Sequence, residues 1–293
     1  MQSLEFGLNM SETGGRQTTS PSSKNELLLA TERGDDVTVR VLLEAGADVN
    51  QQNASGVSAL YVAVQTRNRR MARLLLEAGA DPDLQDASGW CALHKATMME
   101  GLDTLRLLLS QGARVNAQNH NGVTCLHLCV AKLTEHADVI AWYLLESGAD
   151  VNLRDKTGNS AFQLSISLNK MALFHAMCEF KPSVRRADAR GMLPLHAAAL
   201  TNNVEVLSVL LQKNSKLEAE TRDDQRATAL MLATEKRHAD AVAQLRAAGA
   251  SLCAADSRGA TPLSVALSHP NDDHALWTSL LQTCSAKEIF QVN

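Results

Sequence analysis

The sequence predicts an all-α solenoid, in which helical pairs stack in a row instead of surrounding one central core. A Gly-Ala step recurs at 46–47, 79–80, 112–113, 148–149 and 249–250, and its first two intervals are both 33 residues. A tetrapeptide such as Cys91-Ala92-Leu93-His94 keeps the same period, and its copies begin at Ser58, Cys91, Thr124, Ser160, Leu193, Thr228 and Thr261. Aromatic residues are only 3% of the chain, which suits thin, closely packed helices.

The segment 86–118 indicates how one period folds. Gly89 stands in the opening turn, where glycine takes a positive φ at little cost. Cys91 occupies the N-cap of a short first helix. The second helix carries an apolar i, i+3, i+4 face, formed by Leu105, Leu108 and Leu109. Gly112 ends this helix as a left-handed C-cap.

This unit resembles the ankyrin repeat, whose Thr-Pro-Leu-His-like turn recurs about every 33 residues. The resemblance covers residues 25–285 and implies about eight units, the first truncated, each with a β-hairpin finger. It also implies that a histidine at one repeat position ties adjacent units through backbone hydrogen bonds; here these are His94, His127 and His196. Residues 1–24 are rich in Ser, Thr and Gly, so we expect a disordered tail there, and 286–293 as a C-terminal tail.

Three departures from the period are informative. The fifth unit has Lys181-Pro182-Ser183 where other units have Gly-Ala-Asp, so we expect it to be the weak point of the array. The fourth unit has three extra residues within 129–140, and the finger at 218–226 is two residues longer than its counterparts. Length changes in repeats map to loops, so both are candidate recognition insertions, with neutral drift as the alternative.

Composition and charge exclude several classes of function. The net charge is −4 and the pI about 6.1, which disfavours nucleic acid as a partner. No apolar run is long enough for a membrane span, and the N-terminus lacks the features of a secretory signal. The six cysteines do not recur at one repeat position, so we expect free thiols and a cytoplasmic location, with the nucleus as the alternative.

No motif of a nucleotide-binding loop, hydrolase or metalloprotease occurs in the chain. Cys125 and Cys129 are four residues apart on one helical face and could form half of a zinc site, but no further ligands are specified nearby. We therefore expect no enzyme, no cofactor and no small-molecule substrate. A zinc-dependent enzyme is the remaining alternative of a different class.

Two further features have a functional and a structural interpretation. Basic runs occur at Arg67, Arg69, Arg70 and Arg73 and at Arg185, Arg186 and Arg190; they indicate either a site for an acidic partner or a solvated face. Asn50 and Asn152 follow a leucine by eight residues, as in ankyrin repeats that look like substrates of asparaginyl β-hydroxylation. The alternative is that each Asn only forms hydrogen bonds in its turn.

The resemblance places partners on the concave surface, which the fingers and the ends of the first helices line. The candidate partner-binding residues at these positions are Val57, Trp90, Met98, Met99, Val123, Leu168, Met192 and Leu200. An exposed apolar stripe of this kind fits a peptide-like or helical segment with apolar anchors. The alternative for Met98 and Met99 is burial between helices. The sequence thus favours a protein-binding scaffold or adaptor, with a regulatory subunit that masks an enzyme or a transcription factor as the alternative.

Overall fold

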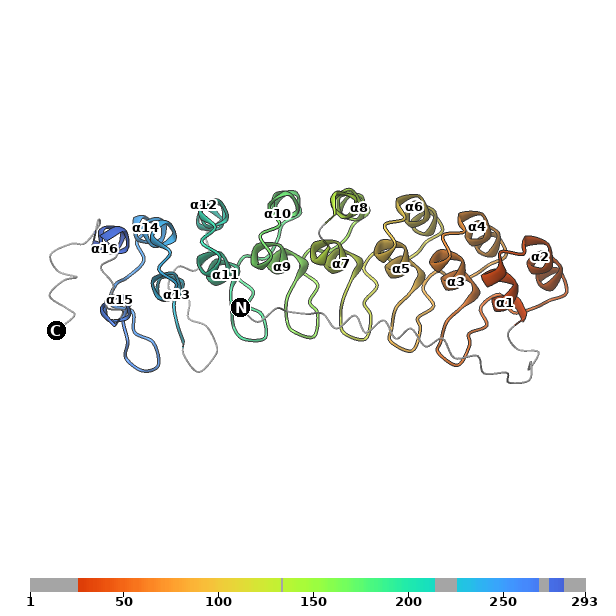
Figure 1. Cartoon of the computed structure of the whole chain (residues 1–293), viewed down its shortest axis with the longest axis horizontal. Coiled ribbons are helices and arrows are strands. Elements are labelled where there is room, and N and C mark those ends of the chain that lie inside the picture. The colour runs from red at the N-terminus through yellow and green to blue at the C-terminus, as the bar shows by residue number, and fades with distance from the viewer. Residues whose placement is uncertain (1–25, 133, 214–225, 269–273, 282–293) are drawn as a thin grey trace.

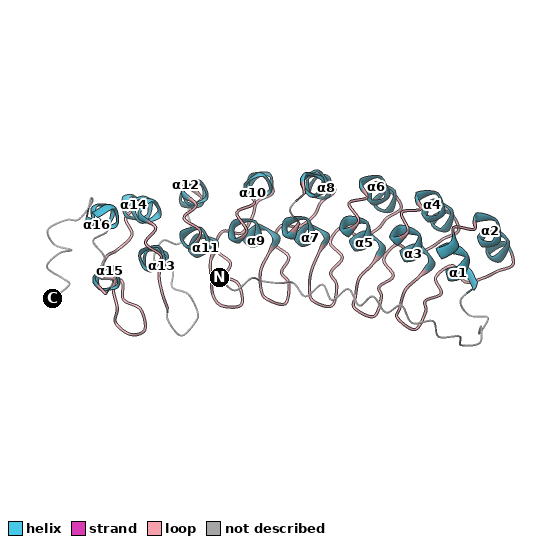
Figure 2. Cartoon of the chain, in the orientation of Figure 1, coloured by secondary structure: helices cyan, strands magenta, loops and turns pink. Residues whose placement is uncertain are grey.

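The computed structural model describes residues 26–132, 134–213, 226–268 and 274–281. Within these ranges the chain forms sixteen helices and no strand, only isolated β-bridges at the fingers (Figure 2). The predicted all-α ankyrin-type solenoid is therefore confirmed. The expected tails at 1–24 and 286–293 lie outside the described residues, as does nearly all of the lengthened finger at 218–226.

The helices form eight successive pairs. The first helices are α1 (Glu26–Arg33), α3 (Ala59–Gln65), α5 (Ala92–Met98), α7 (Cys125–Ala131), α9 (Ala161–Ser167), α11 (Pro194–Leu200), α13 (Ala229–Glu235) and α15 (Pro262–Leu267). The second helices are α2 (Asp36–Glu44), α4 (Arg69–Glu77), α6 (Leu102–Ser110), α8 (Glu135–Glu146), α10 (Met171–Cys178), α12 (Val204–Gln212), α14 (Ala239–Ala247) and α16 (His274–Leu281).

The pairs stand side by side in two rows of helices, with the fingers projecting beyond the row of first helices (Figure 1). The rows bow, and the first helices and fingers lie on the inner, concave side. Each first helix contacts the next first helix along the array. Small residues such as Ala63 and Ala96 are buried at these contacts and allow the close approach.

One apolar core runs through nearly the whole array, from Leu27 in the first unit to Leu280 in the last. Leu105 and Leu108 are fully buried in it, as the helical pattern predicts, whereas Leu109 is half-buried. Because an isolated pair would expose this core to water, each unit depends on its neighbours for stability.

The fingers are built around an Asx turn. The Oδ1 atom of Asp86 accepts hydrogen bonds from the backbone N–H groups of Ser88 and Trp90, at 2.8 and 2.9 Å. The Asp86 N–H donates to the Trp90 carbonyl at 2.9 Å. The same pattern recurs at Asn53, Asn119, Asp155, Asp188 and Asp256. We name each finger after the Asp or Asn residue that forms its Asx turn, as in the Asp86 finger.

Adjacent fingers are joined by backbone hydrogen bonds. The Ala87 N–H donates to the Ser55 carbonyl at 2.9 Å, and the His120 N–H to the Ser88 carbonyl at 3.1 Å. The contact is so close that a Cβ atom on Gly89 would lie 2.4 Å from the His120 nitrogen. Gly89 also has a φ of 82°, so both the spacing and the backbone conformation require glycine here.

The three extra residues of the fourth unit lengthen a helix instead of a loop, contrary to the expectation that they map to a loop. Helix α8 has 12 residues, whereas α6 has 9. Three residues are close to one helical turn, so the helix grows without rotating its apolar face away from the core. The segment before α8 is tied to the third unit, because the Lys132 ammonium and the Thr134 hydroxyl bond the Glu100 carboxylate at 3.0 and 2.8 Å.

The fifth unit lacks the helix ending that the fourth unit has. In the fourth unit Gly148 has a φ of 91°, and the Ala149 N–H donates to the Leu144 carbonyl at 2.9 Å. In the fifth unit Lys181 takes a φ of 51°, which strains a residue with a side chain, and Pro182 has no N–H to donate. These two residues give the predicted weak point a physical basis.

Leu108→Ala should lower the free energy of unfolding by about 2–5 kcal/mol, because it leaves a cavity in the continuous core. Chemical denaturation of both proteins measures this difference. Val37→Ala is the control, since the Val37 side chain is 72% exposed and its loss should change stability little. Equal stability of wild type and Leu108→Ala would contradict the helical register of α6.

The double variant Lys181→Gly/Pro182→Ala should raise the free energy of unfolding by about 1 kcal/mol, because it removes the left-handed strain and restores a helix-closing N–H. Amide hydrogen exchange in α9 and α10 should be slower in this variant than in the wild type. Within the wild type, exchange should be faster in α9 and α10 than in α3–α6. The reverse change in the fourth unit, Gly148→Lys/Ala149→Pro, is the matched control and should destabilise. Unchanged exchange in the fifth unit would show that these residues do not weaken it.

Candidate binding surface

The concave side exposes apolar residues that do not belong to the main core. At the end of α9, Leu168 is 41% exposed. Met192, from the Asp188 finger, and Leu200, from α11, are half-buried. Both pack against Ala227, Met231 and Leu232 of the following unit, in a cluster separate from the continuous core. The structure therefore brings two of the expected residues, Met192 and Leu200, to one apolar cluster with the following unit, and leaves Leu168 exposed at the end of α9.

Nearer the N-terminus the expected residues are more scattered. Met98 and Met99 are half-buried at the end of α5, and neither is part of the continuous core, so burial between helices does not describe them. Trp90 is half-buried, with its ring edge against the His94 ring at a centroid distance of 5.2 Å. Val57 is half-buried in the first complete finger.

The exposure expected of Val123 is wrong. Its side chain is only 8% exposed, and its carbonyl oxygen is bonded to the His94 ring at 3.1 Å. Val57 and Trp90 make the same finger hydrogen bond and are only half-buried, but the preceding units have Leu28 and Tyr61 where Val123 meets the His94 ring. Val123 therefore offers little surface to a partner.

A row of first-helix residues was not singled out from the sequence; most of its members are partly exposed, while Leu164 and Leu232 are buried. It is the repeat position that follows the histidine, and it consists of Leu29, Val62, Lys95, Leu128, Leu164, Ala197, Leu232 and Val265. Only Lys95 is polar, and its ammonium lies over the Tyr61 ring, 5.6 Å from the ring centroid. The sequence signal that could have identified this row is that seven of its eight residues are apolar at the same repeat position.

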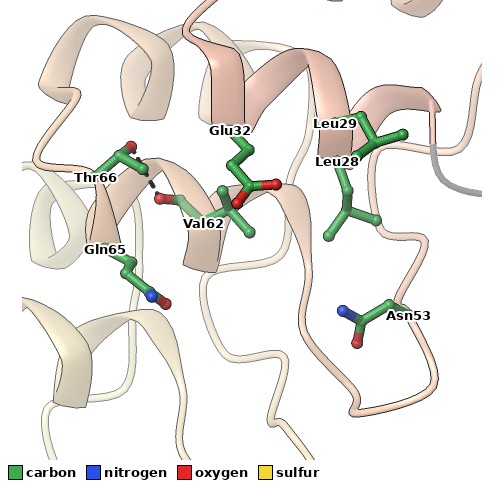
Figure 3. Close-up of a pocket in the computed structure, with 7 residues that line it drawn as sticks. All are labelled: Leu28, Leu29, Glu32, Asn53, Val62, Gln65 and Thr66. Atoms are coloured by element: carbon green, nitrogen blue, oxygen red, sulfur yellow. Dashed lines mark hydrogen bonds between the residues drawn. The ribbon is translucent and has the colours of Figure 1, made fainter. Parts of the chain in front are cut away.

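The first two units form a pocket at the N-terminal end of this row (Figure 3). Its apolar lining is Leu28, Leu29 and Val62, and its polar lining is Glu32, Asn53, Gln65 and Thr66. The Thr66 hydroxyl is not free for a ligand, because it donates to the Val62 carbonyl at 3.0 Å. The concave surface thus continues beyond the residues expected from the sequence.

The repeated histidines connect neighbouring units, as the resemblance implied. His127 Nδ1 accepts the Thr124 N–H at 3.2 Å, so the proton lies on Nε2, which donates to the Asn159 carbonyl of the next finger at 3.2 Å. His94 makes the same pair of contacts with Cys91 and Val123. Gln163 holds this position in the fifth unit, and its Nε2 donates to the Met192 carbonyl at 3.0 Å. The role of these side chains is structural.

The cysteine pair on α7 is buried in the continuous core. Burial raises the pKa of the Cys129 thiol to about 12 and that of Cys125 well above its ordinary value, which favours the protonated thiols over the thiolates that bind zinc. Within the described residues, no group of three His, Cys, Asp or Glu side chains could hold a metal ion. The five described cysteines are free thiols.

Asn50 and Asn152 both bond the backbone of the next unit. Asn50 Oδ1 accepts the Asp81 N–H at 2.7 Å, and Asn152 Oδ1 accepts the Ser183 N–H at 2.7 Å. Each amide therefore has a structural role between units. Hydroxylation at these residues stays a prediction, which an intact mass measurement of protein from cells would test through a species heavier by one oxygen.

The basic run on α4 is partly paired with neighbouring units. Arg69 lies 3.5 Å from Asp103, and Arg70 lies 3.1 Å from Asp36. These exposed pairs bridge successive second helices and contribute little to stability individually. The second basic run lies at the Asp188 finger, in a different part of the array.

Comparison with known proteins identifies the class. The family model for ankyrin repeats, in groups of three copies, matches residues 10–86, 27–119, 78–155 and 126–223. Together these ranges cover more than half of the chain, which therefore belongs to the ankyrin-repeat family. Ankyrin repeats are generally protein–protein interaction modules. Within the described residues, no helix is both long and apolar enough to cross a membrane.

Two relatives show how far the similarity extends. Human ankyrin repeat domain-containing protein 63 is 33% identical over 119 residues, which are 40% of this chain and 31% of that protein. An L-asparaginase of Dirofilaria immitis is 46% identical over 46 residues, which are 16% of this chain and 8% of that protein. The matched regions cover less than a third of either relative, and no asparaginase activity follows for this chain.

The stability of the array should fall as the pH drops below about 6.5, the ordinary pKa of histidine. Burial lowers the pKa values of His94 and His127 in the folded chain, so the unfolded chain binds more protons in this range. The double variant His94→Gln/His127→Gln should flatten this dependence and keep the bonds between units, as Gln163 does. Denaturation at several pH values measures the slope, and His120→Gln at an exposed position controls for loss of a histidine. An unchanged slope in the double variant would contradict the assignment.

Proposed function

We propose that this protein is an interaction scaffold or adaptor that binds a peptide or protein segment with apolar anchors on its concave surface. The main support is that Leu168 at the end of α9, Met192 on the Asp188 finger and Leu200 on α11 are apolar and at least partly exposed. Such surfaces on water-exposed proteins mark interaction sites. The half-buried Met98 and Met99 extend the surface, and methionine adapts to partners of different shape.

The binding would use a surface that exists before the partner arrives. Asx turns fix the fingers, and backbone bonds join neighbouring fingers, so few backbone torsions remain to be ordered on binding. Affinity would then come mainly from apolar burial. A regulatory subunit that masks an enzyme or a transcription factor would use the same surface and differ only in the activity of the bound partner. We place this function in the cytoplasm, with the nucleus as the alternative, because the buried cysteines are free thiols.

The variant Leu168→Ser/Leu200→Ser should weaken binding of concave-surface ligands by about tenfold or more, because two apolar contacts are lost. Peptides selected by phage display on the wild-type chain should be rich in apolar anchors, and titration calorimetry compares their affinities for the two proteins.

Val139→Ser/Val204→Ser is the matched control, since these valines are 54% and 36% exposed on the second helices α8 and α12. It removes two apolar side chains from the opposite row and should leave the affinity unchanged. Selected peptides that bind the Leu168→Ser/Leu200→Ser variant as tightly as the wild type would reject the concave surface as the site. Thermal melts of all three proteins exclude unfolding as the cause.

A further inference from the structure

Three arginines gather between the Asp155 and Asp188 fingers. Arg154 lies directly before Asp155, while Arg185 and Arg186 lie three and two residues before Asp188. Together with Ala187 they line a pocket. Arg154 lies on the loop that joins α8 to α9, and the other three lie on the loop that joins α10 to α11; Figure 1 shows these two loops side by side. All four lie on the segments that lead from the second helices into the fingers. The apolar residues Leu168, Met192 and Leu200 do not line this pocket.

The same pocket occurs two units earlier with a different lining. Between the Asp86 and Asn119 fingers it is lined by Gln85, Asn116, Ala117 and Gln118, together with Arg114 and Val115. In the repeat register, Arg154 corresponds to Gln85, Arg185 to Asn116 and Arg186 to Ala117.

Hydrogen bonds and an ion pair occupy the earlier pocket. Gln85 Nε2 donates across it to the Gln118 carbonyl at 2.8 Å, and the Arg114 guanidinium pairs with Asp83 at 2.8 Å. The fold therefore forms the cavity in both places, and only the later one has three arginines in its lining.

The surroundings add positive charge to the arginine pocket. Lys156 and Arg190 are exposed at the tips of the same two fingers. The two acidic groups that begin these fingers, Asp155 and Asp188, each direct one carboxylate oxygen to backbone N–H groups of their own turn. A local excess of cations thus stands out in a chain whose net charge is −4.

We propose that this pocket binds the phosphate group of a phosphorylated serine or threonine in a partner protein. A guanidinium forms a planar pair of hydrogen bonds with an oxyanion and is held less strongly by water than an ammonium. One carboxylate offers two oxygens and a single charge, whereas a phosphomonoester offers three oxygens and a charge of about −1.5 to −2. The phosphate therefore matches a pocket lined by three arginines better than a carboxylate does.

The intramolecular contacts of the pocket are compatible with this role. Arg154 and Arg185 also interact within the chain. The proposal depends on the shared lining of the pocket and does not require any arginine to lack a partner. It is also independent of the apolar concave surface, so either assignment can fail without the other.

The test is fluorescence anisotropy of the full chain with a short labelled Gly/Ser peptide that carries one phosphoserine. We expect binding that weakens about tenfold or more when phosphoserine is replaced by glutamate, and more again with serine. Binding should also weaken between about pH 7.5 and pH 5, because the second pKa of the phosphate is about 6. The glutamate peptide should change little over the same range.

The matched variant Arg154→Gln/Arg185→Asn/Arg186→Ala replaces each arginine of the pocket with the residue at the same repeat position two units earlier. It should reduce phosphopeptide affinity about tenfold or more, and Arg186→Ala alone, at an exposed residue, should reduce it without affecting the thermal melt. Arg67→Ala/Arg73→Ala, in the other basic run, should have no effect.

Three results would overturn the proposal. One is no binding of the phosphopeptide at about 1 mM, the weak end of measurable affinity. Another is equal binding by the wild type and the triple variant. The third is displacement of the peptide by inorganic phosphate at a concentration equal to the dissociation constant of the peptide. That result would assign the pocket to the free phosphate ion.

Discussion

The contact between successive units is the constraint on which the rest of the structure depends. Each unit is two short helices, and the first helix has only six to eight residues, which is too short to be stable alone in water. Burial of Leu105 and Leu108 becomes possible only when the next pair covers them. The fingers add a second connection, because their backbones bond each other and glycine lets them approach closely.

The polar side chains that recur along the chain serve this contact. His94, His127 and Gln163 each bond the carbonyl of the following finger, and Asn50 and Asn152 each bond an N–H of the following unit. Buried polar groups need such partners, because leaving one unpaired costs about 1–3 kcal/mol. Residues that would suggest catalysis or metal binding in a globular enzyme are therefore part of the frame.

Once the frame is fixed, residues outside it are available for recognition. The row of first-helix residues can hold Leu128 or Lys95 at the same repeat position, and the pocket between fingers can be lined by amides or by arginines, with no change in the stacking. This separation explains how one repeat supports different surfaces along a single array. The chain uses apolar character on the concave side and positive charge between two of its fingers.

The sequence by itself determined the period, the helical pairs and the buried leucines Leu105 and Leu108, and it located the departure at Lys181 and Pro182, because these follow from local spacing. The exposure of individual surface residues was less predictable. Val123 shares a repeat position with Trp90, yet it is buried, because neighbouring side chains decide how much of each finger is covered. Likewise, Arg185, Arg186 and Arg190 looked like one basic run.

Only the tertiary structure placed Arg154, from the preceding unit, beside Arg185 and Arg186, and left Arg190 at the finger tip outside the pocket lining. The tertiary structure also determined that the three extra residues of the fourth unit lengthen α8, since a helix can grow where its apolar face remains on the core. In both cases the deciding contacts join residues about a repeat apart, and the spacing of residues along one unit carries no record of them.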